Sequence, residues 1–141
     1  FNNSEIEKWE IVGHSMGGTV VLFSIMNAEL NENITYNIVA TALHMEIDKV
    51  PMSTRISIEK RFKKCPDNLK SFDEVFSEGF KNELVQWRNI KEFDSQFKKY
   101  DFDPYDKDIK NSKIVQFPDS LNGERVGHTS SLYFSILEII N

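Results

Sequence analysis

The N-terminal part of the chain contains two short apolar runs on either side of a longer mixed one. Residues 9–12, Trp-Glu-Ile-Val, end at a glycine and predict a buried strand. Over residues 17–30 apolar positions recur at steps of three and four, which predicts a helix that ends at Asn31-Glu32-Asn33. Residues 36–43 are rich in β-branched and small side chains and predict a second buried strand. This order indicates a right-handed βαβ unit with parallel strands.

Beyond Pro51 the sequence becomes charged and aromatic, and its large apolar residues advance in threes and fours. These residues are Phe72, Phe76, Phe80, Leu84, Trp87, Ile90, Phe93 and Phe97. With the capping box Ser71-Phe72-Asp73-Glu74 before it, this stripe predicts an amphipathic helix or helix pair, with a kink expected at Gly79. We interpret the stripe as a helix packed on the sheet; the alternative is a lid over an active site.

The C-terminal part of the chain predicts a loop, a short strand and a helix. Residues 100–108 are acidic and broken by Pro104, so we expect a loop there. Residues 114–117 predict a strand, 118–127 a turn-rich connection and 129–140 a terminal helix. The positions expected to face inward on this helix are Leu132, Tyr133, Ile136, Leu137 and Ile140.

Composition and charge exclude several classes of protein. The length of 141 residues fits one domain, 1–141, and 40% hydrophobic residues argue against disorder. A net charge of -5 without a basic face argues against a nucleic-acid partner. No apolar run approaches the roughly 20 residues of a transmembrane helix. The single Cys65 excludes an internal disulfide framework and a multi-cysteine metal site; we give it no role, and we expect a reducing, cytoplasmic location.

The segment Gly13-His14-Ser15-Met16-Gly17 joins the first predicted strand to the first predicted helix. A serine hydroxyl is a weak nucleophile at neutral pH, so it needs an adjacent base, donors for the oxyanion and exposure on a sharp turn. Glycines two residues to either side suit that turn, because a Cβ there would come too close to the backbone. Ser15 is the candidate nucleophile, and the Met16 N–H at the helix start is the candidate oxyanion donor. Acyl-enzyme chemistry needs neither a cofactor nor a metal.

Two other histidines accompany the candidate base. His128 follows Gly127 in the loop before the terminal helix and lies C-terminal to the serine, which favours a catalytic role over a structural one. His14 lies within the turn, and we expect its side chain to point away from the nucleophile and to pack. His44 follows the second strand, where it either lines a pocket or is an ordinary loop histidine.

This constellation resembles the α/β-hydrolase superfamily, especially its lipase, esterase and monoacylglycerol-lipase-like branches, which share the Gly-His-Ser-Met-Gly-Gly form of residues 13–18. The likeness covers residues 9–43 and, more loosely, Gly127-His128 with the terminal helix. It implies a parallel-sheet α/β-hydrolase fold with a helical cap or lid at about 52–100. In that family several strand and helix units precede the nucleophile and supply a second oxyanion donor. We therefore expect this chain to be a C-terminal portion, incomplete at its N-terminus.

The resemblance also implies a carboxylate that orients the histidine, at the end of a strand about two dozen residues before it. Counting back from His128 leads to residues 100–106, where Asp103, followed by Pro104, is our choice. The other aspartates considered are Asp101, Asp106, Asp119 and Asp48. Each of them is at least as well explained as a solvated surface charge.

These residues lead us to expect a serine hydrolase that cleaves a small-molecule or lipid ester through an acyl-enzyme on Ser15. The aromatic stripe slightly favours an acyl-chain or lipid substrate. The alternative from another class is a non-catalytic hydrolase-like module for binding or assembly, or an inactive fragment. A third interpretation keeps the nucleophile but transfers the acyl group to an alcohol or thiol.

Overall fold

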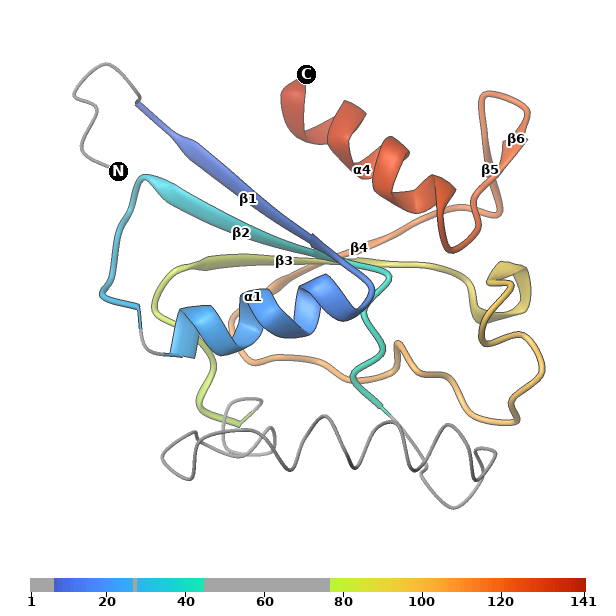
Figure 1. Ribbon diagram of the computed structural model, residues 1–141, viewed down its shortest axis with the longest axis horizontal. Coiled ribbons are helices and arrows are strands. Elements are labelled where there is room, and N and C mark those ends of the chain that lie inside the picture. Colours follow the sequence, from blue (N-terminus) through green and yellow to red (C-terminus); the bar gives the residue numbers. More distant parts are fainter. Residues whose placement is uncertain (1–6, 27, 45–76) are drawn as a thin grey trace.

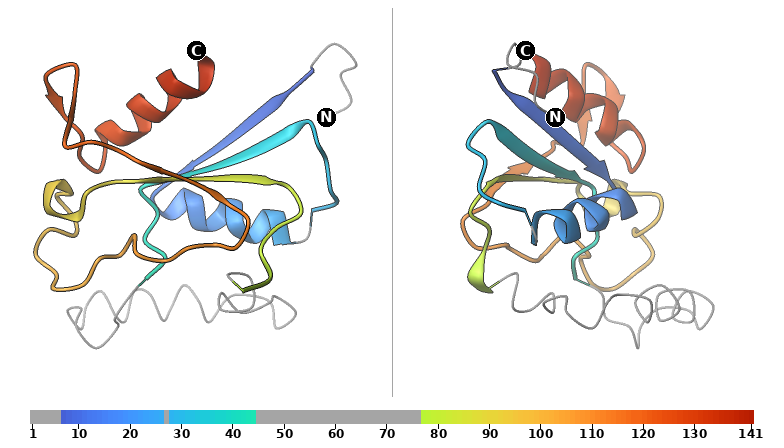
Figure 2. Two further views of the ribbon diagram at one scale, coloured as in Figure 1. Left: turned by 180° about the vertical axis from the view of Figure 1, so that it is seen from behind. Right: turned by 60° about the vertical axis from the view of Figure 1, so that its left-hand side comes forward.

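The computed structural model describes residues 7–26, 28–44 and 77–141, and within them the central feature is a parallel sheet. Its strands, in spatial order, are β1 (Trp9–His14), β2 (Ile34–Val39), β3 (Glu83–Arg88) and β4 (Lys113–Gln116). Helix α1 (Met16–Met26) lies on one face of the sheet and helix α4 (Ser130–Ile140) on the other (Figures 1 and 2). The described residues therefore form a parallel α/β fold. None of their helices is long and apolar enough to cross a membrane.

The N-terminal βαβ unit confirms the order of the predicted elements, although the helix ends at Met26 rather than at Leu30 and the second strand spans Ile34–Val39 rather than 36–43. β1 and β2 pair in parallel over their whole lengths, from Trp9 opposite Ile34 to His14 opposite Val39. The inner side of α1 buries Leu22, which is 0% exposed, in a cluster with Tyr36. Burying one leucine side chain stabilises the folded state by about 1.5–3 kcal/mol. This packing fixes α1, and with it the turn that precedes it, against the sheet.

The helix predicted from the aromatic stripe is wrong where the structure describes it. Residues 83–88 form β3, which pairs in parallel with both β2 and β4. Leu84 and Val85 are both buried because a central strand is covered on both faces, so the alternation of polar and apolar positions that marks a half-exposed strand is missing. The helical cap expected at 52–100 therefore does not extend over β3, while residues 52–76, with the capping box, lie outside the described residues.

Besides β4 and α4, the chain beyond β3 contains three short elements: the 3₁₀ helix η2 (Lys91–Phe93) and a hairpin of β5 (Ser120–Leu121) and β6 (Glu124–Arg125). Residues 100–108 form the predicted loop. The hairpin turns at Asn122 and Gly123, with φ of 53° and 80°, as a two-residue turn requires. It leads the chain from β4 to the start of α4.

Helix α4 confirms the predicted terminal helix, but it turns a different face inward. Its buried residues are Ser131, Phe134 and Ser135, whereas Tyr133 and Ile140 of the predicted inner face are exposed. The two serines tolerate burial because each hydroxyl donates to a backbone carbonyl three residues earlier. Apolar periodicity therefore selected the wrong side of this helix.

Candidate active site

Ser15 lies in the sharp turn between β1 and α1 in a strained conformation. Its φ is 54°, in the left-handed region that residues with a Cβ seldom adopt. The turn is held by a hydrogen bond from the Ser15 N–H to the Val39 carbonyl of 2.8 Å, and by one from the Gly18 N–H to the Ser15 carbonyl of 3.1 Å. This turn, residues 13–17, which we call the elbow, is therefore supported both within itself and by the end of β2.

The glycines around Ser15 do not all have the role expected from the motif. A Cβ at Gly13 would come within 2.6 Å of the Gly17 carbonyl oxygen, which confirms the need for glycine there. A Cβ at Gly17 would meet nothing within 4 Å, so close approach does not explain this glycine. The second tight position is Gly18, where a Cβ would lie 1.9 Å from the Thr41 Oγ1.

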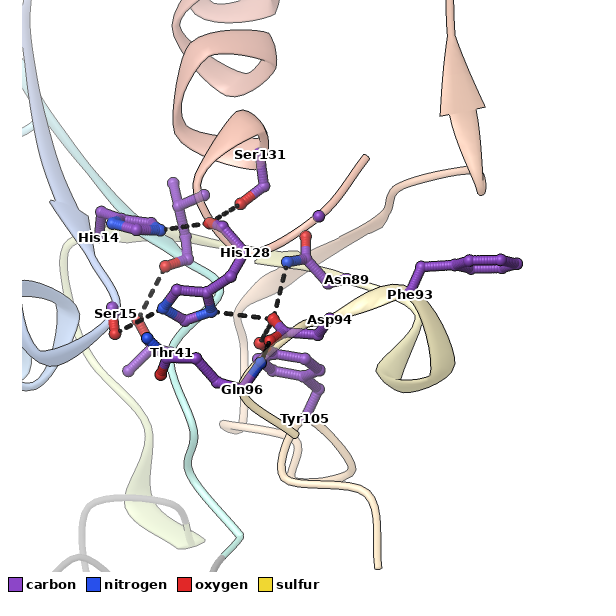
Figure 3. Close-up of polar contacts among 12 residues, drawn as sticks. His14, Ser15, Thr41, Asn89, Phe93, Asp94, Gln96, Tyr105, His128 and Ser131 are labelled. Carbon is purple, nitrogen blue, oxygen red and sulfur yellow. Dashed lines mark hydrogen bonds and ion pairs between the residues drawn. The ribbon is translucent and has the colours of Figure 1, made fainter. Parts of the chain in front are cut away.

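His128 brings the turn and the C-terminal helix together. Its ring is 5% exposed, and its Nε2 lies 2.9 Å from the Ser15 Oγ (Figure 3). Its Nδ1 lies 2.8 Å from Asp94 Oδ2. With the proton on Nδ1, the imidazole donates to Asp94 and accepts from the Ser15 hydroxyl. Ser15 and His128, both expected from the sequence, are thus in direct contact.

The backbone of His128 is also fixed from two sides. Its carbonyl accepts hydrogen bonds from His14 Nε2 at 2.6 Å and from the Ser131 Oγ at 2.8 Å. The His14 and His128 ring centroids are 4.9 Å apart. His14 therefore holds the His128 loop through the hydrogen bond to its carbonyl and also packs against the His128 ring.

Asp94 is fully buried directly after η2 and is surrounded by donors. Its Oδ2 accepts from His128 Nδ1, from the Tyr105 hydroxyl at 2.5 Å and from Asn89 Nδ2 at 3.1 Å, while its Oδ1 accepts from the Gln96 N–H at 2.8 Å. Burial raises the pKa of Asp94, but these hydrogen bonds together outweigh burial and hold the pKa at about 2, below the ordinary 3.8. The group is a carboxylate at neutral pH.

Asp103 does not contact His128, which corrects its choice as the third residue. Asp103 is exposed, and its carboxylate accepts a 2.9 Å hydrogen bond from the Tyr105 N–H. Of the other aspartates considered, Asp101, Asp106 and Asp119 are exposed and Asp48 lies outside the described residues. Asp94 was missed because β3 was interpreted as helix, which hid the strand end that precedes it. Recognising residues 83–88 as a strand would have placed Asp94 in a loop after a strand end, among the candidates for the third residue.

Met16 lies at the start of α1, directly after Ser15, whereas His44 lies in the segment beyond β2. Met16 is the first residue of α1, so its N–H lies next to Ser15 at the positive end of the helix dipole, as expected. His44 lies beyond β2, with its ring centroid 6.0 Å from that of Phe102 and its N–H bonded to the Pro104 carbonyl. The described contacts place His44 with the 100–108 loop.

Ser15, Asp94 and His128 all follow the carboxyl ends of parallel strands, which is where α/β sheets usually place their sites. Together the three side chains define an α/β protein with a Ser-His-Asp hydrogen-bonded chain. Among the described residues there is no group of three or more His, Cys, Asp or Glu side chains arranged to hold a metal ion. Comparisons with protein-family models, with curated proteins and with solved structures find no match.

Proposed function

We propose that this chain is a serine hydrolase of the α/β-hydrolase type that cleaves carboxylic esters through an acyl-enzyme on Ser15. The observation that carries the proposal is the imidazole of His128, hydrogen-bonded to the Ser15 hydroxyl on one side and to the Asp94 carboxylate on the other. The order of these residues along the chain, serine, aspartate, histidine, is the order of that fold class.

In this mechanism the Ser15 Oγ attacks the ester carbonyl carbon while His128 Nε2 takes the hydroxyl proton. Asp94 keeps the Nδ1–H tautomer in place and stabilises the imidazolium. The Met16 N–H donates to the oxyanion. The C–O bond to the alcohol then breaks as the imidazolium returns its proton to the leaving oxygen, and water repeats the sequence on the acyl-enzyme to release the acid.

The strained turn and the buried carboxylate support catalysis over the alternative of a non-catalytic module. A non-glycine residue in a left-handed conformation costs on the order of 1 kcal/mol, and burying a carboxylate requires several donors. A binding or assembly domain gains nothing from aligning Ser15, His128 and Asp94 at these costs. The geometry therefore favours the enzyme.

We propose carboxylic esters as the substrate class without a particular acyl chain. The aromatic stripe does not support a lipid substrate, because Leu84 and Trp87 of that stripe belong to β3 in the sheet. A pocket of about 430 Å³ between the sheet and α4 is lined by Glu10, Asn37 and Trp87 among others, but by none of the three aligned residues.

Labelling with a fluorophosphonate tests the proposal, because this probe reacts only with an activated serine. We expect the folded chain to be labelled, and labelling to vanish in Ser15→Ala and in His128→Ala. Ser24→Ala is the matched control, since Ser24 is exposed on α1 and its hydroxyl donates only to the Val20 carbonyl among the described contacts. An unlabelled wild-type chain that is folded, or labelling that persists in Ser15→Ala, contradicts the proposal.

A further inference from the structure

We infer that Tyr105 is a positioning residue that acts through Asp94 to set the proton affinity of His128; this inference rests on the proposed function. Tyr105 lies in the loop before β4 and is 3% exposed. Its hydroxyl donates to Asp94 Oδ2 at 2.5 Å, the same oxygen that accepts from His128 Nδ1 at 2.8 Å (Figure 3). The phenol and the imidazole therefore share one acceptor.

When two donors share one acceptor oxygen, the hydrogen bond that each donor makes to it is weaker. A hydrogen bond to a carboxylate disperses its negative charge, which lowers its affinity for a proton and its stabilisation of a neighbouring imidazolium. The effect is large at this site because Asp94 is fully buried, and electrostatic interactions are stronger in a low-dielectric interior. The Tyr105 hydroxyl therefore makes Asp94 a weaker partner for protonated His128.

Tyr105 remains a hydrogen-bond donor at and well above neutral pH. Burial, the hydrogen bond to Asp94 and the negative charges of Asp94 and Asp103 raise the pKa of Tyr105 above its ordinary value, and Asn89 offsets only part of this. The phenol therefore keeps its proton well above neutral pH. Its influence on Asp94 is constant with pH.

The remaining groups that face this pair come from several elements. His14 of β1 lies 4.9 Å from the His128 ring between centroids, and the Arg125 guanidinium of β6 donates to the Phe93 carbonyl directly before Asp94. Asn89 donates to Asp94 from the end of β3. Among the described residues, Tyr105 is the ionisable side chain besides His128 that hydrogen-bonds to Asp94. It is therefore the residue to alter.

Tyr105→Phe removes the hydroxyl and keeps the ring, which packs edge-on against Phe97 with centroids 5.8 Å apart. Without this donor Asp94 stabilises the imidazolium more strongly, so His128 loses its proton at higher pH. We expect the acidic limb of the kcat/KM profile to move up by about half to one pH unit. The NMR titration of the His128 ring should move by the same amount. Tyr100→Phe is the matched control, because Tyr100 stacks on Phe102 in the same loop, and its profile should not move.

A second substitution reverses the sign of the effect. Placing 3-fluorotyrosine at position 105 keeps the ring and the hydroxyl but makes the phenol a stronger donor, so the His128 titration should move to lower pH. This variant also covers the case in which Tyr105→Phe does not fold. If the His128 ring titrates at the same pH in the wild-type chain and in both folded variants at position 105, the inference is overturned.

The NMR titration separates this inference from the proposed function because it requires no turnover. If the His128 titration shifts as expected in chains that cleave no ester, the coupling stands and the proposed function fails. If the esters are cleaved and the titration does not shift, the role of Tyr105 fails alone.

Discussion

The proposed nucleophile and the proposed acid are positioned by two different kinds of structure. Ser15 is held mainly by neighbours in sequence, between the end of β1 and the start of α1, with one hydrogen bond from its N–H to Val39. Asp94 depends on side chains spread along the chain, from Asn89 to His128, 34 residues beyond it. The position of Ser15 is thus encoded in a contiguous motif, while the surroundings of Asp94 are assembled by tertiary contacts.

This difference sets how each position responds to change. A strained turn persists when the helix and strands that flank it are packed, so the elbow is fixed by the core beneath α1. A buried carboxylate persists only while its donors remain in place, because an unpaired buried charge is costly. Substitutions far from Asp94 in sequence should therefore disturb the acid more readily than the nucleophile.

The largest effect expected is that of the acid itself. Asp94→Asn should lower kcat by about 10⁴-fold, because the amide no longer holds the Nδ1–H tautomer of His128. Asp103→Asn should leave kcat within about twofold, since Asp103 is exposed and bonded to the Tyr105 N–H rather than to His128. Hydrolysis of a chromogenic ester measures both. If Asp103→Asn lost more kcat than Asp94→Asn, Asp103 rather than Asp94 would be the residue that orients His128.

The features that could be predicted from the sequence are those encoded in a contiguous stretch of the chain. The elements of the βαβ unit, Ser15 and His128 follow from local patterns: an apolar run ending at glycine, a helical period, and a histidine before a terminal helix. The position of Asp94 does not follow from a local pattern. Its separation from His128 along the sequence depends on the long connection from β3 to β4, whose length no local rule fixes.

Two other parts were missed because burial overrides periodicity. β3 lacks the alternation of a half-exposed strand, and its Leu84 and Trp87 happen to lie three residues apart, as on one side of a helix. On α4 three residues of the apolar stripe, Tyr133, Ile136 and Ile140, are exposed, while Ser131 and Ser135 are buried with their hydroxyls satisfied by backbone carbonyls. In both cases side-chain polarity alone misjudges which surface the fold covers.

The elbow has its own test in a pair of adjacent glycines. Gly18→Ala should lower the free energy of unfolding by about 1–3 kcal/mol, because its Cβ would lie 1.9 Å from the Thr41 Oγ1. Gly17→Ala should be neutral or stabilise by up to about 1 kcal/mol, since its Cβ meets nothing and alanine favours a helix. Urea denaturation of both variants measures the difference. Equal losses of stability in the two variants would mean that the close approach to Thr41 does not require glycine at position 18.

The carboxylate network predicts a smaller effect, confined to low pH. Because the pKa of Asp94 is held at about 2 in the folded chain, below the ordinary 3.8, its ionised form stabilises the fold above pH 3.8. That contribution is lost as the pH falls from 3.8 to about 2 and is on the order of 2 kcal/mol. In Asp94→Asn the free energy of unfolding should fall less steeply across this window, while the exposed Asp103→Asn should keep the wild-type slope. Equal slopes in all three chains would show that Asp94 has the same proton affinity folded and unfolded, and that its donors do not act together as the hydrogen-bonding geometry requires.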